Sequence, residues 1–261
     1  MLRSSSAVLL LAAAGVLGSC VHIPTDKERQ GAEAHYDLGI NAQAAGDVRS
    51  ALKEFEESLK LDPDFAEAHN AIAVLLHLSF DRKDEAEKHY KQALETRPSF
   101  SEAKVNLGNL YLDEGRLDEA IALYEQALND MLYATPYIAE ANLGWAYFKK
   151  GNSTQALEHL RASVTHNPSF CLGYKDLGLV QDAKGDLAAA CTEFGRFVQA
   201  CPKVPEAHQL LGSCLVRQGR AAEARASFDA CVANATDAPQ QRVREQCIHL
   251  RDGLGGQGAR P

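Results

Sequence analysis

The sequence lacks the features on which membrane-spanning, nucleic-acid-binding and metal-dependent proteins usually rely. Its one long apolar run, residues 7–17, is about half of the roughly 20 residues that a membrane-spanning helix needs. Lys and Arg number 27 against 35 Asp and Glu and form no basic cluster, which argues against a nucleic-acid partner. No Cys-x-x-Cys or His-Glu-x-x-His occurs. We therefore expect no bound nucleic acid, no metal and no cofactor.

The apolar run instead belongs to an export signal. It follows Arg3 and ends at Leu17-Gly18-Ser19-Cys20, which resembles the bacterial lipoprotein signal of an apolar residue, two small residues and a cysteine. The resemblance implies cleavage after residue 19 and a covalent lipid on Cys20, whose thiol can form the thioether. Val21, in place of aspartate, favours the outer membrane by the sorting rules of such lipoproteins. The alternative is an ordinary secretory signal in which Cys20 is incidental.

The rest of the chain is repetitive. Leu-Gly with a second Gly seven residues later recurs in HYDLGINAQAAGD, KVNLGNLYLDEGR, EANLGWAYFKKGN, YKDLGLVQDAKGD and HQLLGSCLVRQGR, and HNAIAVLLHLSFD is a divergent copy. The small residues that anchor the six copies are Gly39, Ala73, Gly108, Gly144, Gly178 and Gly212, at separations of 34, 35, 36, 34 and 34 residues. This pattern resembles the tetratricopeptide repeat (TPR), a 34-residue helix-turn-helix unit.

The resemblance implies an all-α fold, a right-handed solenoid of six repeats closed by a C-terminal capping helix. Small residues let the two helices of a repeat approach, an aromatic residue fills the seam, and glycine forms the turn between them. The predicted segments are a signal peptide (1–19), a lipid-anchored linker (20–31), six repeats (32–65, 66–100, 101–136, 137–170, 171–204 and 205–236), a capping helix (237–252) and a disordered tail (253–261).

Apart from Cys20, all cysteines lie in the last third of the chain, and an even number of them in an exported protein indicates disulfides. Residues equally far from the turn meet in adjacent antiparallel helices. This height matching favours three pairs, Cys171–Cys201, Cys191–Cys214 and Cys231–Cys247, the last with a poorer match. The alternative is that several of these cysteines are small buried residues, since Cys231 stands where the repeat has alanine.

Catalytic motifs are also missing. Neither Gly-x-Ser-x-Gly nor a phosphate-binding loop is present, and the nine histidines are scattered. The G-x-G-x-x-G of the tail has no strand before it and no helix after it, so it does not indicate a nucleotide site. We expect a protein that is not an enzyme and that has no small-molecule substrate.

What remains is a surface for a protein partner. In this repeat family, fixed positions of the first helix line a concave groove. Carried onto this chain, they are Tyr36, Ile40, Val74, Val105, Asn109, Leu112, Trp145, Phe148, Leu179 and Val216. Apolar grooves indicate partners, and buried Trp side chains are frequent anchors. The alternative is that Trp145 and Phe148 pack between repeats. Asn106, Asn109 and Asn142 are present, but the basic residues that would complete a carboxylate clamp are missing.

A lipoprotein signal followed by six TPR units resembles the type IV pilus pilotin lipoproteins, the PilF/PilW family, and especially its members in social gliding motility. The resemblance implies an outer-membrane lipoprotein, facing the periplasm, that binds a secretin subunit of the PilQ type and helps the secretin channel to assemble. Fold alone does not establish function. A periplasmic adaptor for barrel assembly or for cell-wall hydrolases is the alternative, and an unrecognised enzyme is a third.

Overall fold

The computed structural model describes residues 23–254, and these residues form thirteen α-helices and one short 3-10 helix, without a strand. None of the described helices is long and apolar enough to cross a membrane. The helices are α1 (Asp26–Ala44), α2 (Val48–Leu61), α3 (Ala66–Leu78), α4 (Lys83–Thr96), α5 (Ser101–Asp113), α6 (Leu117–Leu128), α7 (Pro136–Lys149), α8 (Ser153–His166), α9 (Cys171–Ala183), α10 (Leu187–Ala200), α11 (Pro205–Arg217), α12 (Ala221–Asn234), η1 (Ala238–Gln240) and α13 (Gln241–Gly253).

Successive helices pair as antiparallel hairpins, from α1 with α2 to α11 with α12, so that each predicted repeat holds one pair. Five of the six turns inside the pairs contain a glycine in the left-handed region, for example Gly46 with φ of 78°. The second repeat has one more residue in its turn, and there Asp81 takes the positive φ, 51°. This extra residue accounts for the 35-residue spacing from Ala73 to Gly108.

The anchoring glycines allow each helix pair to pack closely. A Cβ built on Gly108 would lie 2.6 Å from Cε1 of Tyr124, so the aromatic ring rests directly on the glycine backbone. In the fourth repeat Leu160 replaces the aromatic residue, and a Cβ on Gly144 would lie 2.8 Å from its Cγ. A side chain at Gly108 or Gly144 would require the neighbouring ring or leucine to shift, which is the expected role of the Leu-Gly signature. The second repeat has Ala73 at this position, and it is fully buried.

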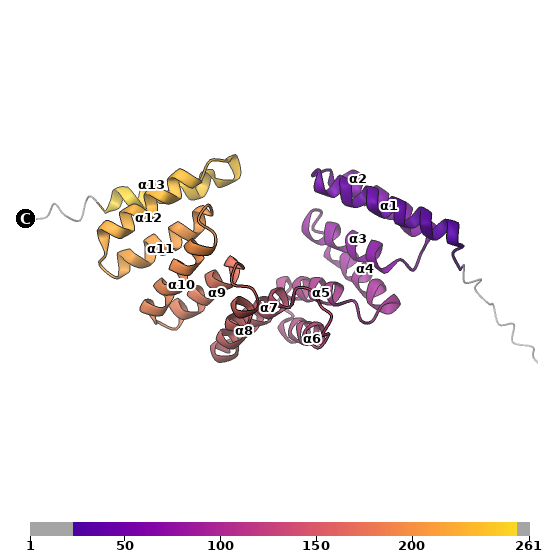
Figure 1. Cartoon of the computed structure of the whole chain (residues 1–261), viewed down its shortest axis with the longest axis horizontal. Coiled ribbons are helices and arrows are strands. Elements are labelled where there is room, and N and C mark those ends of the chain that lie inside the picture. Colours follow the sequence, from indigo (N-terminus) through magenta and orange to yellow (C-terminus); the bar gives the residue numbers. More distant parts are fainter. Residues whose placement is uncertain (1–22, 255–261) are drawn as a thin grey trace, which may run out of the picture.

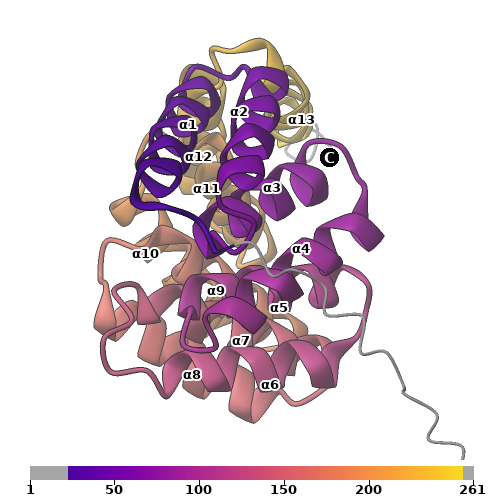
Figure 2. The ribbon, with the colours of Figure 1, turned by 90° about the vertical axis from the view of Figure 1, so that its right-hand side faces the viewer.

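The hairpins stack into an open arch (Figure 1). Helices α3, α5, α7 and α9 lie on the inner side of the bend, and α4, α6, α8 and α10 lie on the outer side. Both ends of the arch rise on the same side of its base, as the view turned by 90° also shows (Figure 2). The first helix of each repeat therefore lines the concave face.

One large apolar cluster dominates the first half of the arch, beside a small one of Ala66, Ala93 and Ala103, and the core of the second half is divided. One cluster of buried side chains extends from Ala51 on α2 to Ala146 on α7. Beyond it, smaller clusters lie around α7–α9, α10–α11 and α11–α13. The second half of the arch therefore has less shared apolar contact between its repeats.

Three disulfides lie in this second half. Cys171–Cys201 closes the fifth repeat, Cys191–Cys214 joins α10 to α11, and Cys231–Cys247 joins α12 to α13, with Cα–Cα distances of 5.8, 5.5 and 6.3 Å. These are the pairs favoured by height matching in the sequence. The disulfides therefore link helices in the half of the arch where the apolar clusters are small.

Two helices do not follow the bounds of the predicted segments. Helix α1 begins at Asp26, inside the predicted linker 20–31, because Thr25 and Glu28 form a capping box: the Thr25 hydroxyl accepts from Glu28 N, and Thr25 N donates to the Glu28 carboxylate. The predicted capping helix 237–252 is a 3-10 turn followed by α13, which ends at Gly253. Cys20 and the last seven residues of the predicted tail lie outside the described residues.

Candidate partner-binding groove

The concave face is built from the first helix of each repeat, here called helix A. Helix A contacts the second helix, helix B, through its anchor, so the next residue along the chain, about 100° further around helix A, turns out of that contact. At this position stand Ile40, Val74, Asn109, Trp145 and Leu179, all at least partly exposed. The residues therefore form one row along the inner side of the arch.

Nine of the ten predicted groove residues reach the surface. Ile40 is exposed, and the other eight are half-buried, as expected for side chains that line a groove while packing against its floor. The eight are Tyr36, Val74, Asn109, Leu112, Trp145, Phe148, Leu179 and Val216.

The prediction for Val105 is wrong. Its side chain is only 3% exposed and belongs to the main core. The position lies at the flank of each helix A, where neighbouring helices cover a short side chain. Long side chains at the equivalent position, such as Tyr36 and Lys175, extend past this cover and stay half-exposed, whereas Ala141 is buried like Val105.

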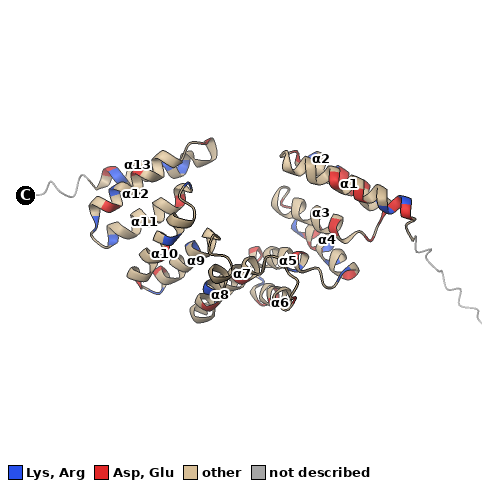
Figure 3. Cartoon of the chain, in the orientation of Figure 1, with Lys and Arg blue, Asp and Glu red and all other residues tan. Residues whose placement is uncertain are grey.

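Trp145 and Phe148 form the aromatic centre of the groove. Their ring centroids lie 5.2 Å apart in a tilted arrangement, and Lys149 Nζ lies 5.7 Å from the Trp145 ring centroid. Phe148 packs against the core cluster of α7–α9, which holds it in place. Helix α7 carries only two charged residues, Glu140 and Lys149, so its ribbon is mostly tan in Figure 3. This arrangement offers a half-open aromatic surface for an apolar side chain of a partner.

A row of amide side chains runs beside these apolar residues. Asn106 Nδ2 donates to Asn70 Oδ1 at 3.0 Å, and Asn142 Nδ2 donates to Asn109 Oδ1 at 2.8 Å. Tyr124 donates its hydroxyl to the same Asn109 oxygen at 2.8 Å. The bonds join α3 to α5 and α5 to α7. They use Nδ2 of Asn106 and Asn142 and leave Oδ1 of both residues available to accept a ligand's N–H. The sequence predicts three of these residues as an incomplete clamp and Asn70 as a groove position, but the bond between Asn70 and Asn106 depends on the register between neighbouring repeats.

The C-terminal part of the inner face is more polar. Lys175 Nζ lies 3.8 Å from the Glu206 carboxylate, and Arg217 pairs with Asp182 at 2.5 Å. Burial raises the pKa of the Asp176 carboxyl to about 6, Lys175 partly opposes this, and Glu206 adds to it. The groove thus changes from apolar and amide-lined at its centre to charged toward α11.

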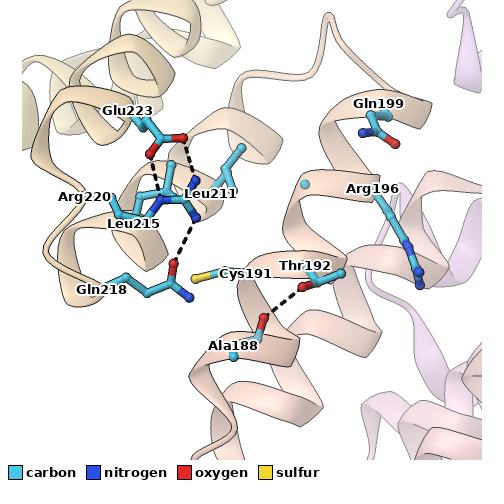
Figure 4. Close-up of a pocket in the computed structure, with 11 residues that line it drawn as sticks. Ala188, Cys191, Thr192, Arg196, Gln199, Leu211, Leu215, Gln218, Arg220 and Glu223 are labelled. Carbon is cyan, nitrogen blue, oxygen red and sulfur yellow. Dashed lines mark hydrogen bonds and ion pairs between the residues drawn. The ribbon is translucent and has the colours of Figure 1, made fainter.

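A second concavity, of about 390 Å³, lies between α10 and the α11–α12 hairpin (Figure 4). Several of its polar groups are bonded to one another: Arg220 donates to Glu223 and Gln218, and Thr192 donates to the carbonyl of Ala188. Arg196 bonds to Glu193 beside the pocket. No group of three or more His, Cys, Asp or Glu side chains that could hold a metal ion occurs among residues 23–254. The cleft brings together no nucleophile with a general base, so the concave face is the better candidate site.

The chain belongs to the tetratricopeptide repeat family, which it matches over residues 32–65, 74–137, 141–205 and 175–239. It is similar to the type IV pilus assembly protein PilF of Pseudomonas aeruginosa, with 29% identity over 182 residues that cover 66% of this chain and 71% of PilF.

Solved structures extend the similarity over the arch. The crystal structure of PilW, a widely conserved type IV pilus biogenesis factor, superimposes with a TM-score of 0.73 at 26% identity, covering 82% of this chain and 98% of PilW. The structure of Pseudomonas aeruginosa PilF gives a TM-score of 0.70 at 19% identity and supports the fold alone, covering 84% of this chain and 97% of PilF.

Proposed function

We propose that this protein acts in type IV pilus biogenesis as a pilotin, an outer-membrane lipoprotein that promotes assembly of the secretin channel. The observation that carries the proposal is the arch itself, which matches PilW over 98% of the PilW chain. In this chain the arch has an aromatic pair, Trp145 and Phe148, at the centre of its inner face. The sequence similarity to PilF supports the same process. The further resemblance to the social gliding motility pilotin Tgl remains a prediction.

In this proposal the groove binds a segment of a secretin protomer. Trp145, Leu112 and Leu179 provide half-buried apolar surface for the side chains of an amphipathic helix or an extended segment. The free amide oxygens of Asn106 and Asn142 accept hydrogen bonds from the segment's N–H groups, which would otherwise lose their partners on leaving water. Apolar contact supplies affinity, and the amide row supplies orientation.

A lipid on Cys20 would hold the groove at the membrane in which the secretin assembles. Several acyl chains anchor far more strongly than one, at about 0.8 kcal/mol per buried methylene. The three disulfides support export, because such bonds persist in oxidising compartments such as the periplasm. The protein body would then face the periplasm and raise the local concentration of binding sites near the inserting protomer.

Deletion of the gene and complementation test the proposal. The deletion strain should lack detergent-resistant secretin multimers and surface pili, and the wild-type gene should restore both. Trp145→Ala should restore them poorly, because truncating a central aromatic anchor commonly costs 2 kcal/mol or more, at least about thirty-fold in affinity.

Leu38→Ala is the matched control. Leu38 is a large apolar residue that is 53% exposed on α1, and because it lies two residues before Ile40 it is on the other side of that helix from the groove row. Its replacement should restore multimers fully. Normal multimers in the deletion strain would contradict the pilotin role and favour an adaptor for another assembly. Full restoration by Trp145→Ala would place the partner outside the groove.

A further inference from the structure

The two long edges of the arch differ in chemistry. Because every repeat is an antiparallel helix pair, the connections between repeats lie on one edge together with the start of α1, and the turns within repeats lie on the other. We name these the connection edge and the turn edge. The turns carry mainly glycine and charged residues, as in Glu114-Gly115-Arg116. The connections place Phe65, Phe100 and Phe170 at the starts of α3, α5 and α9.

The strongest apolar feature of the connection edge is the segment between α6 and α7. It spans residues 129–135, whereas the other connections between repeats span four residues. At its tip, Met131 is 98% and Leu132 is 92% exposed. Two adjacent large apolar side chains held entirely in water are unfavourable and indicate a contact surface.

The tip is held in position from within the fold. Asp130 accepts from Leu132 N at 2.9 Å and from Ser101 Oγ at 2.7 Å, which ties the turn to α5. Tyr133 follows directly, and its side chain is buried in the main core. The backbone on both sides of Met131 and Leu132 is therefore anchored, so their outward direction is a property of the fold.

We propose that Met131 and Leu132 enter the interfacial layer of the lipid bilayer to which the chain is tethered, so that the connection edge faces the membrane. This inference rests on the proposed lipid anchor. Cys20 lies three residues before Ile23, at most about 11 Å of extended chain. Because Ile23 is exposed at the start of the same edge, a lipid on Cys20 brings this edge to the bilayer surface.

The second contact sets orientation. A single tether leaves the arch free to tilt, whereas a tether at Cys20 and an apolar tip at the middle of the arch define the line along which it meets the membrane. The hydrogen bonds from Ser101 and Leu132 lower the pKa of the Asp130 carboxyl, so Asp130 stays charged and limits insertion to the two side chains of the tip. The bilayer interface, rather than its hydrocarbon centre, is thus the layer that the tip reaches.

Tryptophan fluorescence of the intact mature lipoprotein in phosphatidylethanolamine–phosphatidylglycerol vesicles with brominated acyl chains tests the contact. Leu132→Trp places a reporter at the tip, and Leu78→Trp places one at the exposed apolar residue of the turn edge. The wild-type protein supplies the background, because Trp145 is its only tryptophan. Both substituted residues are exposed, so both variants should keep the wild-type Tm.

The added emission of Leu132→Trp should be quenched several-fold more than that of Leu78→Trp. Vesicle flotation, measured in parallel, reports the lipid anchor itself. Flotation without preferential quenching at position 132 would overturn the membrane contact while leaving the anchor intact, and would be the outcome if the tip serves a protein partner. Failure to float would overturn the anchor and this inference with it.

Discussion

Cys191 on α10 and Cys214 on α11 join the fifth repeat to the sixth through a disulfide with Cα atoms 5.5 Å apart. Cys171–Cys201, in contrast, closes the fifth repeat upon itself. One bond therefore couples two repeats, and the other stabilises one repeat. In a solenoid, stability is a sum of repeat terms and nearest-neighbour terms, so the two bonds act on different terms.

Loss of the coupling bond should separate the sixth repeat from the fifth. The variant Cys191→Ser/Cys214→Ser lacks this disulfide, whose cysteines are 23 residues apart in the sequence. It should lose about 3 kcal/mol of stability, because the unfolded chain is no longer constrained by the loop. Amide hydrogen exchange in α11–α13 should then rise well above that in α3–α6. Cys171→Ser/Cys201→Ser is the matched control, with exchange in α11–α13 less affected; equal acceleration in both variants would contradict the assignment.

Two glycines should respond in opposite ways to alanine. A Cβ on Gly178 would lie 2.4 Å from Cε1 of Phe194, so Gly178→Ala should lose about 1–3 kcal/mol through overpacking. Gly195, inside α10, has no atom within 4 Å of the added Cβ, so Gly195→Ala should gain about 0.5–1 kcal/mol from helix propensity. Urea unfolding measures both, and a stabilising Gly178→Ala would be incompatible with the close helix contact.

Asp176 should destabilise the fold when it is charged. Its native pKa is raised to about 6 from an ordinary value of 3.8, so the folded state binds more protons between these values. The stability contributed by the neutral carboxyl is present below pH 4 and is lost as the pH rises through 6. Asp176→Asn should therefore be more stable than the wild type at pH 7.5 by about 1–3 kcal/mol, with the difference vanishing near pH 4. Thermal unfolding at the two pH values decides this.

Two histidines should give opposite pH dependence. The hydrogen bond from His159 to Glu140, at 2.7 Å, raises the pKa of His159, so its stabilisation is present at low pH and lost as the pH rises through that pKa. Burial, and then His69, lowers the pKa of His89, whose Nδ1 lies 2.9 Å from Nδ1 of His69. Protonation of His89 therefore costs stability as the pH falls below about 6.5.

The variants His159→Gln and His89→Gln separate these effects. Relative to the wild type, His159→Gln should lose about 0.5 kcal/mol at pH 6 and nothing at pH 9, as expected for a partly exposed pair. His89→Gln should gain relative stability as the pH falls from 7 to 5. Parallel pH slopes in urea unfolding would contradict the two opposite pKa shifts.

The sequence was sufficient for the hairpins because each Leu-Gly signature is a local steric requirement. Gly108 must face Tyr124, and a spacing of 34 to 36 residues leaves room for little except one helix pair per repeat. The disulfide pairs were also readable, since antiparallel pairing places residues at matching heights. The capping-box spacing of Thr25 and Glu28 also marks the start of α1, although both residues lie inside the predicted linker.

Details of the groove were less accessible, because they depend on neighbouring repeats. Val105 occupies a groove position of its own repeat, yet neighbouring helices cover its short side chain. The hydrogen bond between Asn70 and Asn106 depends on the register between the second and third repeats. Met131 is exposed because Tyr133, in the same seven-residue connection, packs into the core. The sequence does not show which residue of this connection is buried.

The three disulfides that link the divided core of the second half have a mechanical consequence. A linear array under tension unravels from its free end, one unit after another, because each unit is held only by its neighbour. Counting from the C-terminus, the cap, the sixth repeat and the fifth are linked covalently, and the first boundary without such a link is that between α8 and α9. A pull on the C-terminal end is therefore transmitted to the middle of the arch, and the C-terminal third moves as one linked block.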